Sequence, residues 1–519
     1  MLVCIHAAKC VGIQADGVSV EVDITMGIGI HLVGLADAAV KESLLRTVTA
    51  LQAKGFHIPG KKIVINLAPA DVHKQGGGYD LPIALGIIAA SAQRELPALE
   101  DYLIMGELGL DGSIRYVPGT LPMVDLARQK GLKGCILPER SALEAADCSD
   151  LRIYGVKTLD DAITILSLAQ GSESLLIRNS ALFLENASGP HRHGISYMDF
   201  ADILGQESAR RGVEIAASGG HNVLLIGAPG SGKSSLAKAM AGILPPMTLE
   251  ESLITSKIYS VAGTSLEGIG LIRERPFRAP HISASKAAML GGGSGENILP
   301  GEVSLATNGV LFLDEFCEAP KSTLEALRAP MEDRKVTISR LKSKVEFPSS
   351  FMLVAASNPC PCGYWGEGAR CRCTQSQRLT YISKLSGPIM DRIDIQLWMH
   401  PVKTQELLAR KKAESSEEIA RRVVRTREIQ LRRFKGGKTF TNAEMSSDEL
   451  DRYCALSPEC KAVIENIIDE VGLSARAYTR ILKIARTIAD MESEEALLPH
   501  HLSEAASYRF LDRRDILDI

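Results

Sequence analysis

The stretch VLLIGAPGSGKS at residues 223–234 decides the fold of the middle of the chain. Its first four residues form an apolar run, and the rest fits the pattern G-x-x-x-x-G-K-[ST] and leads into an alanine-rich helical run. In this strand–loop–helix setting, the backbone amides of the loop and the start of the helix can surround a phosphate group. The stretch therefore predicts an α/β domain whose P-loop binds a nucleoside triphosphate.

We expect the residues of this loop to contact ATP and its metal ion. Glycines allow backbone amides to point inward around the β-phosphate. Lys233 can reach the β- and γ-phosphates, and Ser234 can ligate Mg²⁺. The predicted contacts are Gly227, Ala228, Pro229, Gly230, Ser231, Gly232, Lys233 and Ser234.

Two further apolar runs end in polar residues. Residues 310–313 lead into Asp314 and Glu315, and residues 351–356 lead to Asn358. Apolar runs without alternation are typical of central strands in a parallel sheet, so these side chains should meet at one edge. Asp314 can hold the Mg²⁺ ion through its water shell, and Glu315 can polarise the attacking water. Asn358 can orient that water or sense the γ-phosphate.

Two arginines can neutralise charge in the transition state of phosphoryl transfer. Arg392 follows a Gly-Pro turn, and Arg476 lies at the start of a helix in the last part of the chain. Each could act on the nucleotide of its own chain or on that of a neighbouring subunit. Taken alone, each arginine is better explained by an ordinary ion pair.

Composition limits the remaining organisation. A chain of 519 residues is expected to hold two to four domains. With 45% hydrophobic and 23% charged residues it has the balance of a soluble globular protein. Because the net charge is only -3, a nucleic-acid surface would have to be a local patch. No apolar stretch approaches about 18 residues and no signal-peptide pattern is present, so we expect a cytoplasmic protein that makes no membrane contact.

Periodicity divides the chain into four parts. Residues 1–170 alternate short strands and helices, which predicts a compact α/β unit. Residues 171–197 lose this periodicity and are interpreted as a linker. Residues 198–400 contain the P-loop and the two later strands. Residues 401–519 contain helical patterns only and are predicted to form a helical lid.

A cluster of four cysteines follows Asn358. The pairs Cys360, Cys362 and Cys371, Cys373 are separated by eight residues. Four thiolates can surround a tetrahedral Zn²⁺, although the spacing C-x-C is less usual than C-x-x-C. A metal-free loop with reactive thiols and a site for another metal remain alternatives.

The order of these parts resembles an AAA+ ATPase. Further stretches narrow the resemblance to the magnesium-chelatase-like ATPases of the ComM/YifB type and extend it over nearly the whole chain. They are Gly205-Gln206, His221-Asn222, RPFRAPH at 275–281, PGEVSLA at 300–306 and residues 473–490.

The resemblance implies a fold, an assembly and an activity. The fold is an AAA+ P-loop core with an N-terminal S5/Lon-protease-like α/β domain and a C-terminal helical lid, and the assembly is a homo-hexameric ring. Asn358 takes the part of sensor 1, Arg392 of the arginine finger and Arg476 of sensor 2, and Gln206 joins the ATP contacts. The activity that the resemblance implies is that of a DNA helicase. The resemblance also implies that this helicase carries out branch migration on single-stranded and branched DNA during natural transformation.

The same resemblance assigns two loops to the pore of the ring. Residues 275–301 would carry the helix-2 insert, and residues 334–348 the presensor hairpin. Related helicases contact DNA with such loops, so Arg340, Lys342 and Lys344 become candidate DNA contacts. Alternatively, these three cations belong to a hairpin that is exposed to solvent and binds no ligand. A second basic stretch, residues 421–435, could bind phosphates or form ion pairs within the protein or between subunits.

The first part of the chain resembles the S5-like domain of Lon proteases through KQGGGYD at 74–80 and GELGLDG at 106–112. It departs from that family where the chemistry takes place: Gly78 stands at the position of the nucleophilic serine, and Leu121 at that of the partner lysine. Because a serine nucleophile needs a hydroxyl and an adjacent base, we predict no peptidase activity. ATP-dependent proteolysis by the pure protein would contradict this prediction.

Two other functions remain open. The chain could be a chaperone-like ATPase partner of a metal-inserting enzyme of the magnesium-chelatase type, although the Lon-like first part disfavours this role. It could also be a DNA-binding protein whose ATPase switches its assembly state without translocation. Such a protein would form ATP-dependent oligomers but would not displace strands.

Overall fold

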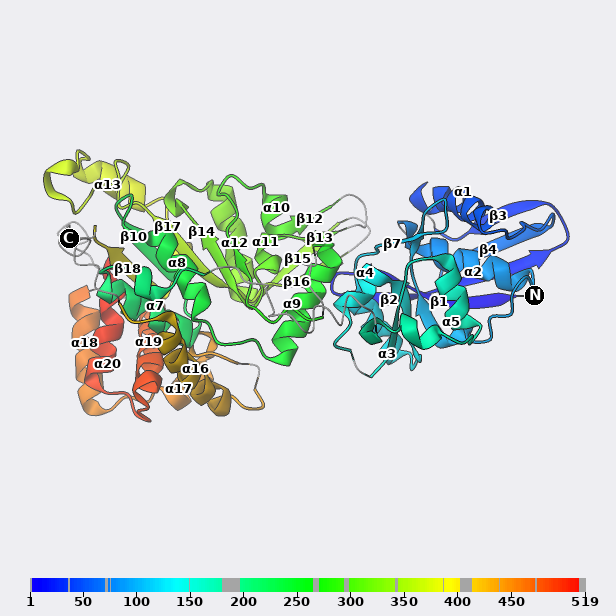
Figure 1. The fold of residues 1–519 in the computed structure, drawn as a ribbon. Coiled ribbons are helices and arrows are strands. Elements are labelled where there is room, and N and C mark those ends of the chain that lie inside the picture. Colours follow the sequence, from blue (N-terminus) through cyan, green and yellow to red (C-terminus); the bar gives the residue numbers. More distant parts are fainter. Residues whose placement is uncertain are drawn as a thin grey trace.

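The fold is that of a computed structural model of the chain, and it contains two separate α/β units and a helical region (Figure 1). The structure describes residues 2–35, 38–70, 73–74, 76–148, 150–179, 197–264, 270–293, 298–340, 344–385, 387–401, 413–437, 439–471 and 474–512. The predicted linker at 171–197 and the candidate DNA contact Lys342 therefore lie largely or wholly outside the described residues.

The first unit is built on a seven-stranded mixed sheet with the order β3-β4-β2-β1-β5-β8-β9. The long hairpin β1–β2 is antiparallel, and β5, β8 and β9 continue the sheet in parallel from β1. Its strands are β1 (Val3–Val11), β2 (Gln14–Thr25), β3 (Gly29–Val33), β4 (Lys62–Ala68), β5 (Tyr102–Ile104), β8 (Gly134–Pro138) and β9 (Arg152–Val156), with the small hairpin β6 (Glu107–Leu108) and β7 (Ile114–Arg115) beside them. Its helices are α1 (Ala38–Ala53), α2 (Asp80–Ala90), α3 (Thr120–Gln129), α4 (Glu139–Glu144) and α5 (Leu159–Leu166).

The second unit is built on a five-stranded sheet in which every pair of neighbouring strands is parallel. The order is β11-β14-β17-β10-β18, with β11 (Phe277–Arg278), β14 (Val310–Leu313), β17 (Met352–Ser357), β10 (Val223–Gly227) and β18 (Ile395–Met399). Alternate residues of β10, β14 and β17 belong to two different apolar clusters, one on each face. The predicted buried parallel strands are thus confirmed, because both faces of the sheet are covered.

Helices and hairpins surround this second sheet. The helices are α7 (Glu207–Gly219), α8 (Lys233–Gly242), α9 (Leu249–Ala262), α10 (Lys286–Leu290), α11 (Glu302–Leu305), α12 (Lys321–Asp333), α13 (Gln375–Ile382) and α14 (Gly387–Met390). Two small hairpins are β12 (Gly291–Gly292) with β13 (Leu299–Pro300), and β15 (Lys335–Ser339) with β16 (Lys344–Pro348). The second hairpin lies where the sequence predicts the presensor hairpin.

The C-terminal region is helical in the described residues from 413 onward, as predicted. It contains α16 (Ser416–Arg433), α17 (Ser447–Tyr453), α18 (Pro458–Val471), α19 (Ala475–Glu492) and α20 (Pro499–Ser507). Its apolar side chains share one cluster with α7, α8 and the central sheet. None of the described helices is long and apolar enough to cross a bilayer.

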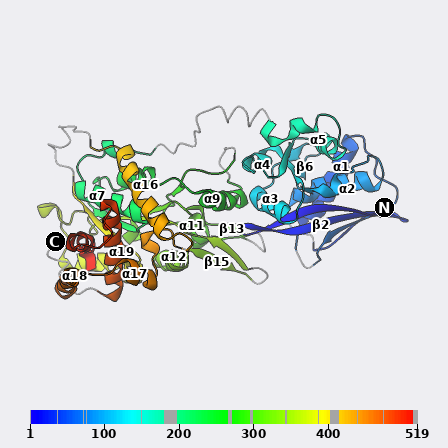
Figure 2. The same ribbon diagram turned by 90° about the horizontal axis from the view of Figure 1, so that it is seen from below.

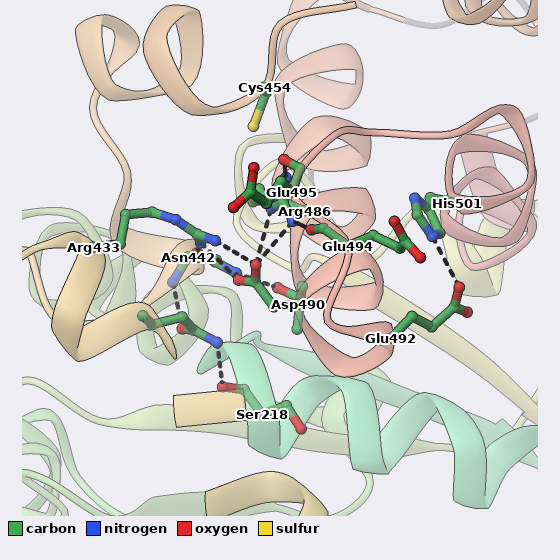
Figure 3. A network of polar contacts seen from close by, with 12 residues as sticks. Ser218, Arg433, Asn442, Cys454, Arg486, Asp490, Glu492, Glu494, Glu495 and His501 are labelled. Carbon is green, nitrogen blue, oxygen red and sulfur yellow. Dashed lines mark hydrogen bonds and ion pairs between the residues drawn. The ribbon is translucent and has the colours of Figure 1, made fainter. Parts of the chain in front are cut away.

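A buried polar network joins this helical lid to the core (Figure 3). Asp490 of α19 accepts hydrogen bonds from Arg433 at 2.7 Å, from Asn442 at 2.8 Å and from Arg486 at 3.1 Å. Gln430 of α16 donates at 3.0 Å to the carbonyl of Ser218, which belongs to α7. Several arginines of the basic stretch 421–435 therefore make internal contacts, because Arg433 pairs with Asp490 and Arg422 pairs with Glu214 and Glu414.

The first unit contacts the second through one end of its long hairpin (Figure 2). Val11 and Ile13, at the turn between β1 and β2, pack on a small apolar cluster that includes Val345 and Phe347 of β16. Next to this contact, α3 packs on α9, where the Lys257 ammonium pairs with Asp125. The hairpin assigned to the pore is therefore in contact with the N-terminal unit.

Candidate active site

The P-loop connects the end of β10 to the start of α8. Gly230 and Gly232 have φ angles of +80° and +91°, in the left-handed region that favours glycine. Gly227 is required for a different reason: a Cβ there would lie 2.5 Å from the carbonyl oxygen of Met399 and 2.7 Å from the Ser231 hydroxyl. The glycines that the sequence pattern singles out thus permit a backbone path that other residues would obstruct.

Lys233 is a buried cation, and its ammonium contacts only neutral oxygens. Its Nζ donates to the carbonyls of Gly227 at 2.6 Å and Ala228 at 3.0 Å, and lies 3.4 Å from the side-chain oxygen of Asn358. Burial lowers the pKa of Lys233, and the nearby Asp314 carboxylate opposes that shift. Among the contacts that this ammonium makes with the described residues, none is to a carboxylate. A buried cation without a counter-ion fits an anionic ligand.

The Ser231 hydroxyl supports the same reading. Its oxygen is buried and makes no hydrogen bond within the described residues, although it lies in the middle of the loop. Buried hydroxyls are nearly always hydrogen-bonded, so an unpaired one marks a place where a ligand is expected to complete the site. The residues of the loop therefore fit a bound phosphate chain.

The two carboxylates lie at the carboxyl edge of the same sheet. The Ser234 hydroxyl donates to Asp314 Oδ2 at 3.0 Å, which brings the two predicted Mg²⁺ contacts together. The other oxygen of Asp314 accepts a hydrogen bond from the backbone of Glu315 at 2.9 Å. Glu315 has a φ angle of +50°, and both carboxylates are exposed. Oxygen ligands of this kind suit Mg²⁺.

Gln206 and Asn358 approach the loop from either side. Asn358 follows β17, the strand between β10 and β14, and reaches Lys233 as described. Gln206 precedes α7, and its amide donates at 3.3 Å to the carbonyl of Ser231 and also to that of His400, which follows β18. In this structure, Gln206 therefore binds the backbone of the loop and holds it against the end of β18.

The two predicted arginines lie at the opposite edge of the sheet. Arg392 lies three residues before the start of β18, whose residues pair in parallel with β10, so it stands near the amino ends of both strands. The side chain of Asn222, which precedes β10, donates to the Arg392 carbonyl at 2.8 Å. Because β10 has five residues and a strand rises about 3.3 Å per residue, about 16 Å separate this edge from the P-loop. The structure does not bring either arginine to the P-loop of its own chain.

Arg392 and Arg476 share a cavity of about 300 Å³ at this amino edge. Arg476 is an exposed side chain that pairs with Asp391 at 2.5 Å, and Arg392 pairs with Glu332 at the end of α12. Each of these arginines is thus held by one carboxylate, as the ion-pair alternative anticipated, and both line the same opening.

A third arginine lines the same cavity. Arg480, one turn after Arg476 on α19, pairs at 2.8 Å with Asp394, whose side chain is 1% exposed. The other oxygen of Asp394 accepts from the backbone of Asn222 at 3.0 Å and lies 3.5 Å from His221. The spacing of Arg476, Arg480 and Lys483 in the sequence predicts that these three cations share one helical face, which could contact phosphates.

The remaining predicted residues lie apart from these two edges. Arg340 and Lys344 are exposed on the hairpin β15–β16, and the nearest carboxylate to Lys344 is Glu346 at 4.0 Å. The four cysteines are brought together between β17 and α13. In the N-terminal unit, Leu121 is buried, and a side chain at Gly78 would contact Met105 and Val117, so the surroundings there are apolar.

Known proteins match the chain over its whole length. Family profiles described as subunit ChlI of Mg-chelatase, magnesium chelatase subunit ChlI, and magnesium chelatase subunit ChlI C-terminal match residues 20–141, 199–407 and 413–509. The competence protein ComM of Haemophilus influenzae is 41% identical over 515 residues, and the protein YifB of Salmonella typhimurium is 40% identical over 515 residues. Each match covers 99% of this chain and 98% of the relative.

A shorter match concerns a protease. The archaeal Lon protease of Methanocaldococcus jannaschii is 26% identical over 144 residues, which are 28% of this chain and 22% of the protease. This match agrees with the Lon-like N-terminal unit that the sequence resemblance predicts. Matches of about 40% identity along nearly the entire length decide the relationship: the chain belongs to the ComM/YifB family of magnesium-chelatase-like AAA+ ATPases.

Proposed function

We propose that the protein is an ATP-driven ring motor that moves branch points in DNA. The observation that carries the proposal is the division of the ATPase unit into two edges. The P-loop, Asp314 and Glu315 lie at the carboxyl edge, whereas Arg392 and Arg476 lie at the amino edge, about 16 Å away. A single chain therefore holds the parts of one ATP site on two separate surfaces.

Two different surfaces that complete each other favour a ring. Contact between the amino edge of one subunit and the carboxyl edge of the next is a head-to-tail interface, which closes into a cyclic assembly when the rotation allows it. In such a ring, Arg392 and Arg476 of one subunit face the phosphates bound by its neighbour. We propose the hexamer that the family resemblance implies, with six shared ATP sites.

Each residue then has a separate task in hydrolysis. Bound ATP with Mg²⁺ supplies the phosphoryl group and a metal ion that neutralises the phosphate oxygens. Lys233 exchanges its carbonyl partners for phosphate oxygens, and Ser234 and Asp314 hold the metal ion. Glu315 accepts a proton from the attacking water, and Asn358 orients that water. Charge that develops on the transferred phosphoryl group and on the departing ADP would be neutralised by the neighbour's arginines, and this makes hydrolysis depend on ring assembly.

The DNA part of the proposal rests on the hairpin β15–β16 and on the family. Arg340 and Lys344 are exposed, and in the part of the hairpin that the structure describes neither has a carboxylate partner closer than 4.0 Å. Exposed cations of this kind can bind phosphates of a nucleic acid and release counter-ions. The name of the competence protein ComM connects a relative of this chain with competence. We therefore propose single-stranded and branched DNA as the substrate.

The test is branch movement on forked and on three- and four-stranded DNA junctions with ATP and Mg²⁺. Wild type should move branches, whereas Lys233→Ala and Glu315→Gln should lose ATP hydrolysis by about 100-fold or more and move none. The matched control is Lys238→Ala, which removes an exposed lysine of the same helix and should leave both activities unchanged. ATP hydrolysis without branch movement, on DNA that is nevertheless bound, would replace the motor by an assembly switch.

The hairpin contacts are tested by salt dependence. Replacing Arg340 and Lys344 with alanine should weaken DNA binding and make it less sensitive to salt, since each lost phosphate contact lowers the salt slope by about one. Lys335→Ala is the control, because Lys335 stands at the base of the same hairpin and is paired with Glu346 at 3.1 Å. An unchanged salt slope in the double variant would remove this hairpin from the DNA surface.

A second function is favoured by the descriptions of the matching profiles. All three name a magnesium chelatase subunit, including the one that matches residues 20–141. The N-terminal unit alone therefore does not separate a motor from a chaperone-like partner of a metal-inserting enzyme. Failure to bind any DNA, with ATP hydrolysis intact, would favour this second function and direct the search to a protein client.

A further inference from the structure

The loop between β17 and α13 brings four thiols into one small volume. The sulfurs of Cys360, Cys362, Cys371 and Cys373 all lie within 4.8 Å of one another. Three of the separations are 3.3 Å, 3.9 Å and 3.7 Å, for the pairs 360–362, 360–371 and 362–371. Four sulfurs at about 2.3 Å from a tetrahedral zinc ion are about 3.8 Å apart. The three separations lie within about 0.5 Å of this value, and they are far longer than the roughly 2.05 Å of a disulfide.

The groups around the sulfurs suit thiolates. Backbone amides of Tyr364, Trp365 and Arg372 lie near the sulfurs of Cys360 and Cys362. The Arg378 guanidinium donates to the Cys371 sulfur at 3.3 Å. A zinc ion with four thiolates carries a net charge of about -2, so amide and guanidinium donors stabilise it.

The same loop packs directly on the nucleotide site. Gly363 has a φ angle of +84°, and a Cβ at this position would lie 2.9 Å and 3.0 Å from ring atoms of Pro229 in the P-loop and 3.9 Å from Asn358. Only glycine allows so close an approach in this conformation. The loop that contains the cysteines therefore touches both the P-loop and the residue that approaches Lys233.

Aromatic contacts anchor the other side of the loop. Trp365 packs edge-to-face on Trp398 of β18, with ring centroids 5.7 Å apart, and the guanidinium of Arg378 lies over Trp365. Trp398 precedes Met399, whose carbonyl contacts Gly227. The loop is thus fixed between β18 and the P-loop. A cross-link within the loop would keep β18 and the P-loop in a fixed position relative to each other.

We propose that Cys360, Cys362, Cys371 and Cys373 bind one structural zinc ion that keeps Asn358 and Pro229 in position for nucleotide binding. With four protein ligands the ion has no open coordination position, so it takes no direct part in hydrolysis. Coordination of the zinc ion would stabilise the conformation of this loop, in the way that backbone hydrogen bonds stabilise a helix or a strand. Metal binding itself does not depend on the proposed DNA function, whereas the effect on nucleotide binding rests on the ATP site.

The first experiment measures metal in the full-length protein, purified without added metal, by elemental analysis. The expected result is about one zinc per chain in wild type and less than about 0.2 in Cys362→Ser and in Cys371→Ser. The matched control is Cys148→Ser, a half-buried cysteine of the N-terminal unit, which should keep the full zinc content. Less than about 0.2 zinc in wild type, or iron in its place, overturns the assignment.

A second experiment avoids variants that fold poorly. Wild-type protein is stripped of metal with a chelator, and binding of a fluorescent ATP analogue is compared before stripping, after stripping and after adding back Zn²⁺ or Co²⁺. Stripping should weaken binding several-fold, and Zn²⁺ should restore it. Co²⁺ should give the visible absorption of a tetrahedral tetrathiolate site. Unchanged nucleotide binding after complete stripping would overturn the role at the P-loop, and absence of the cobalt spectrum would overturn the site.

Discussion

The two edges of the ATPase sheet differ in how their charged groups are satisfied. At the carboxyl edge, Lys233 contacts neutral carbonyls, and Asp314 and Glu315 are exposed. At the amino edge, Arg392 pairs with Glu332 and Arg476 with Asp391. One edge is therefore arranged to receive a ligand, whereas the other holds its cations on carboxylates of the same chain. In the proposed ring, the arginines exchange these carboxylates for phosphates of the neighbour.

The strongest test of this contrast mixes two inactive subunits. Arg392→Ala should lower ATP hydrolysis by about 1,000-fold, because an arginine that neutralises the transition state contributes at least that much. Lys233→Ala should be equally inactive. In rings formed from equal amounts of both variants, about a quarter of the interfaces combine an intact Lys233 with an intact Arg392 of the neighbour. We expect hydrolysis to recover toward a quarter of wild type in co-expressed, doubly tagged and co-purified rings.

The control for mixing is the double variant Lys233→Ala/Arg392→Ala combined with Arg392→Ala. This mixture contains no interface with both residues intact, so hydrolysis should stay at the level of the single variants. Recovery in this control would mean that Arg392 is not required. Absence of recovery in the first mixture, in rings shown to contain both subunits, would contradict the division of the site between two chains.

A smaller effect is expected on the free energy of unfolding when the buried ion pair at the amino edge is removed. Asp394 is buried beneath the arginine cavity and is held by Arg480 and by the backbone of Asn222. Asp394→Asn leaves a largely buried guanidinium without its partner, which should lower the free energy of unfolding by about 3 kcal/mol. Urea unfolding followed by tryptophan fluorescence reports on this part of the molecule, because the two tryptophans of the chain, Trp365 and Trp398, both belong to the ATPase unit.

Asp391→Asn is the matched control for this measurement. It removes the same kind of group three residues earlier, but the partner, Arg476, is 70% exposed. An exposed ion pair contributes less than about 1 kcal/mol, so the unfolding midpoint should hardly move. Equal losses for the two variants would mean that Asp394 does not anchor the amino edge.

The two edges also differ in how far the sequence predicts them. The carboxyl edge follows from local patterns, since the P-loop is contiguous and Asp314, Glu315 and Asn358 each follow an apolar strand. Parallel strands bring such positions together whatever their order in the sheet. The contact between Arg480 and Asp394 depends on β18 lying beside β10 and on the packing of α19 below both strands. No local pattern encodes these neighbours, which are 86 positions apart.

In the N-terminal unit, too, the local elements could be predicted from the sequence, whereas a contact between distant segments could not. Its strands and helices follow the predicted alternation, as in β4 at Lys62–Ala68 and α1 at Ala38–Ala53. Its docking on the ATPase unit was not predicted, because Val11 and Ile13 have the same apolar pattern as the residues inside the sheet. Apolarity alone does not distinguish a side chain that packs within a domain from one that packs between two.

The smallest predicted effect is a pH dependence of the same amino edge. His221 is fully buried, and burial lowers its pKa; the neighbouring Asp394 carboxylate opposes this shift, whereas Lys483 and Arg480 add to it. A lowered pKa means that the folded chain favours the neutral ring, whereas the unfolded chain titrates at about 6.5. This contribution to stability is therefore complete above about pH 6.5 and is lost as the pH falls below it.

His221→Asn should flatten this dependence. In wild type, the urea midpoint read from tryptophan fluorescence should fall between pH 7 and pH 5, and the variant should show a smaller fall over the same range, because asparagine does not titrate there. Asn can still reach toward the Thr487 hydroxyl, which His221 contacts at 2.8 Å, so the change mainly removes the charge. His57→Asn, at an exposed position of the N-terminal unit, should keep the wild-type slope. An identical slope in the His221 variant would locate the proton uptake between about pH 7 and pH 5 at another group.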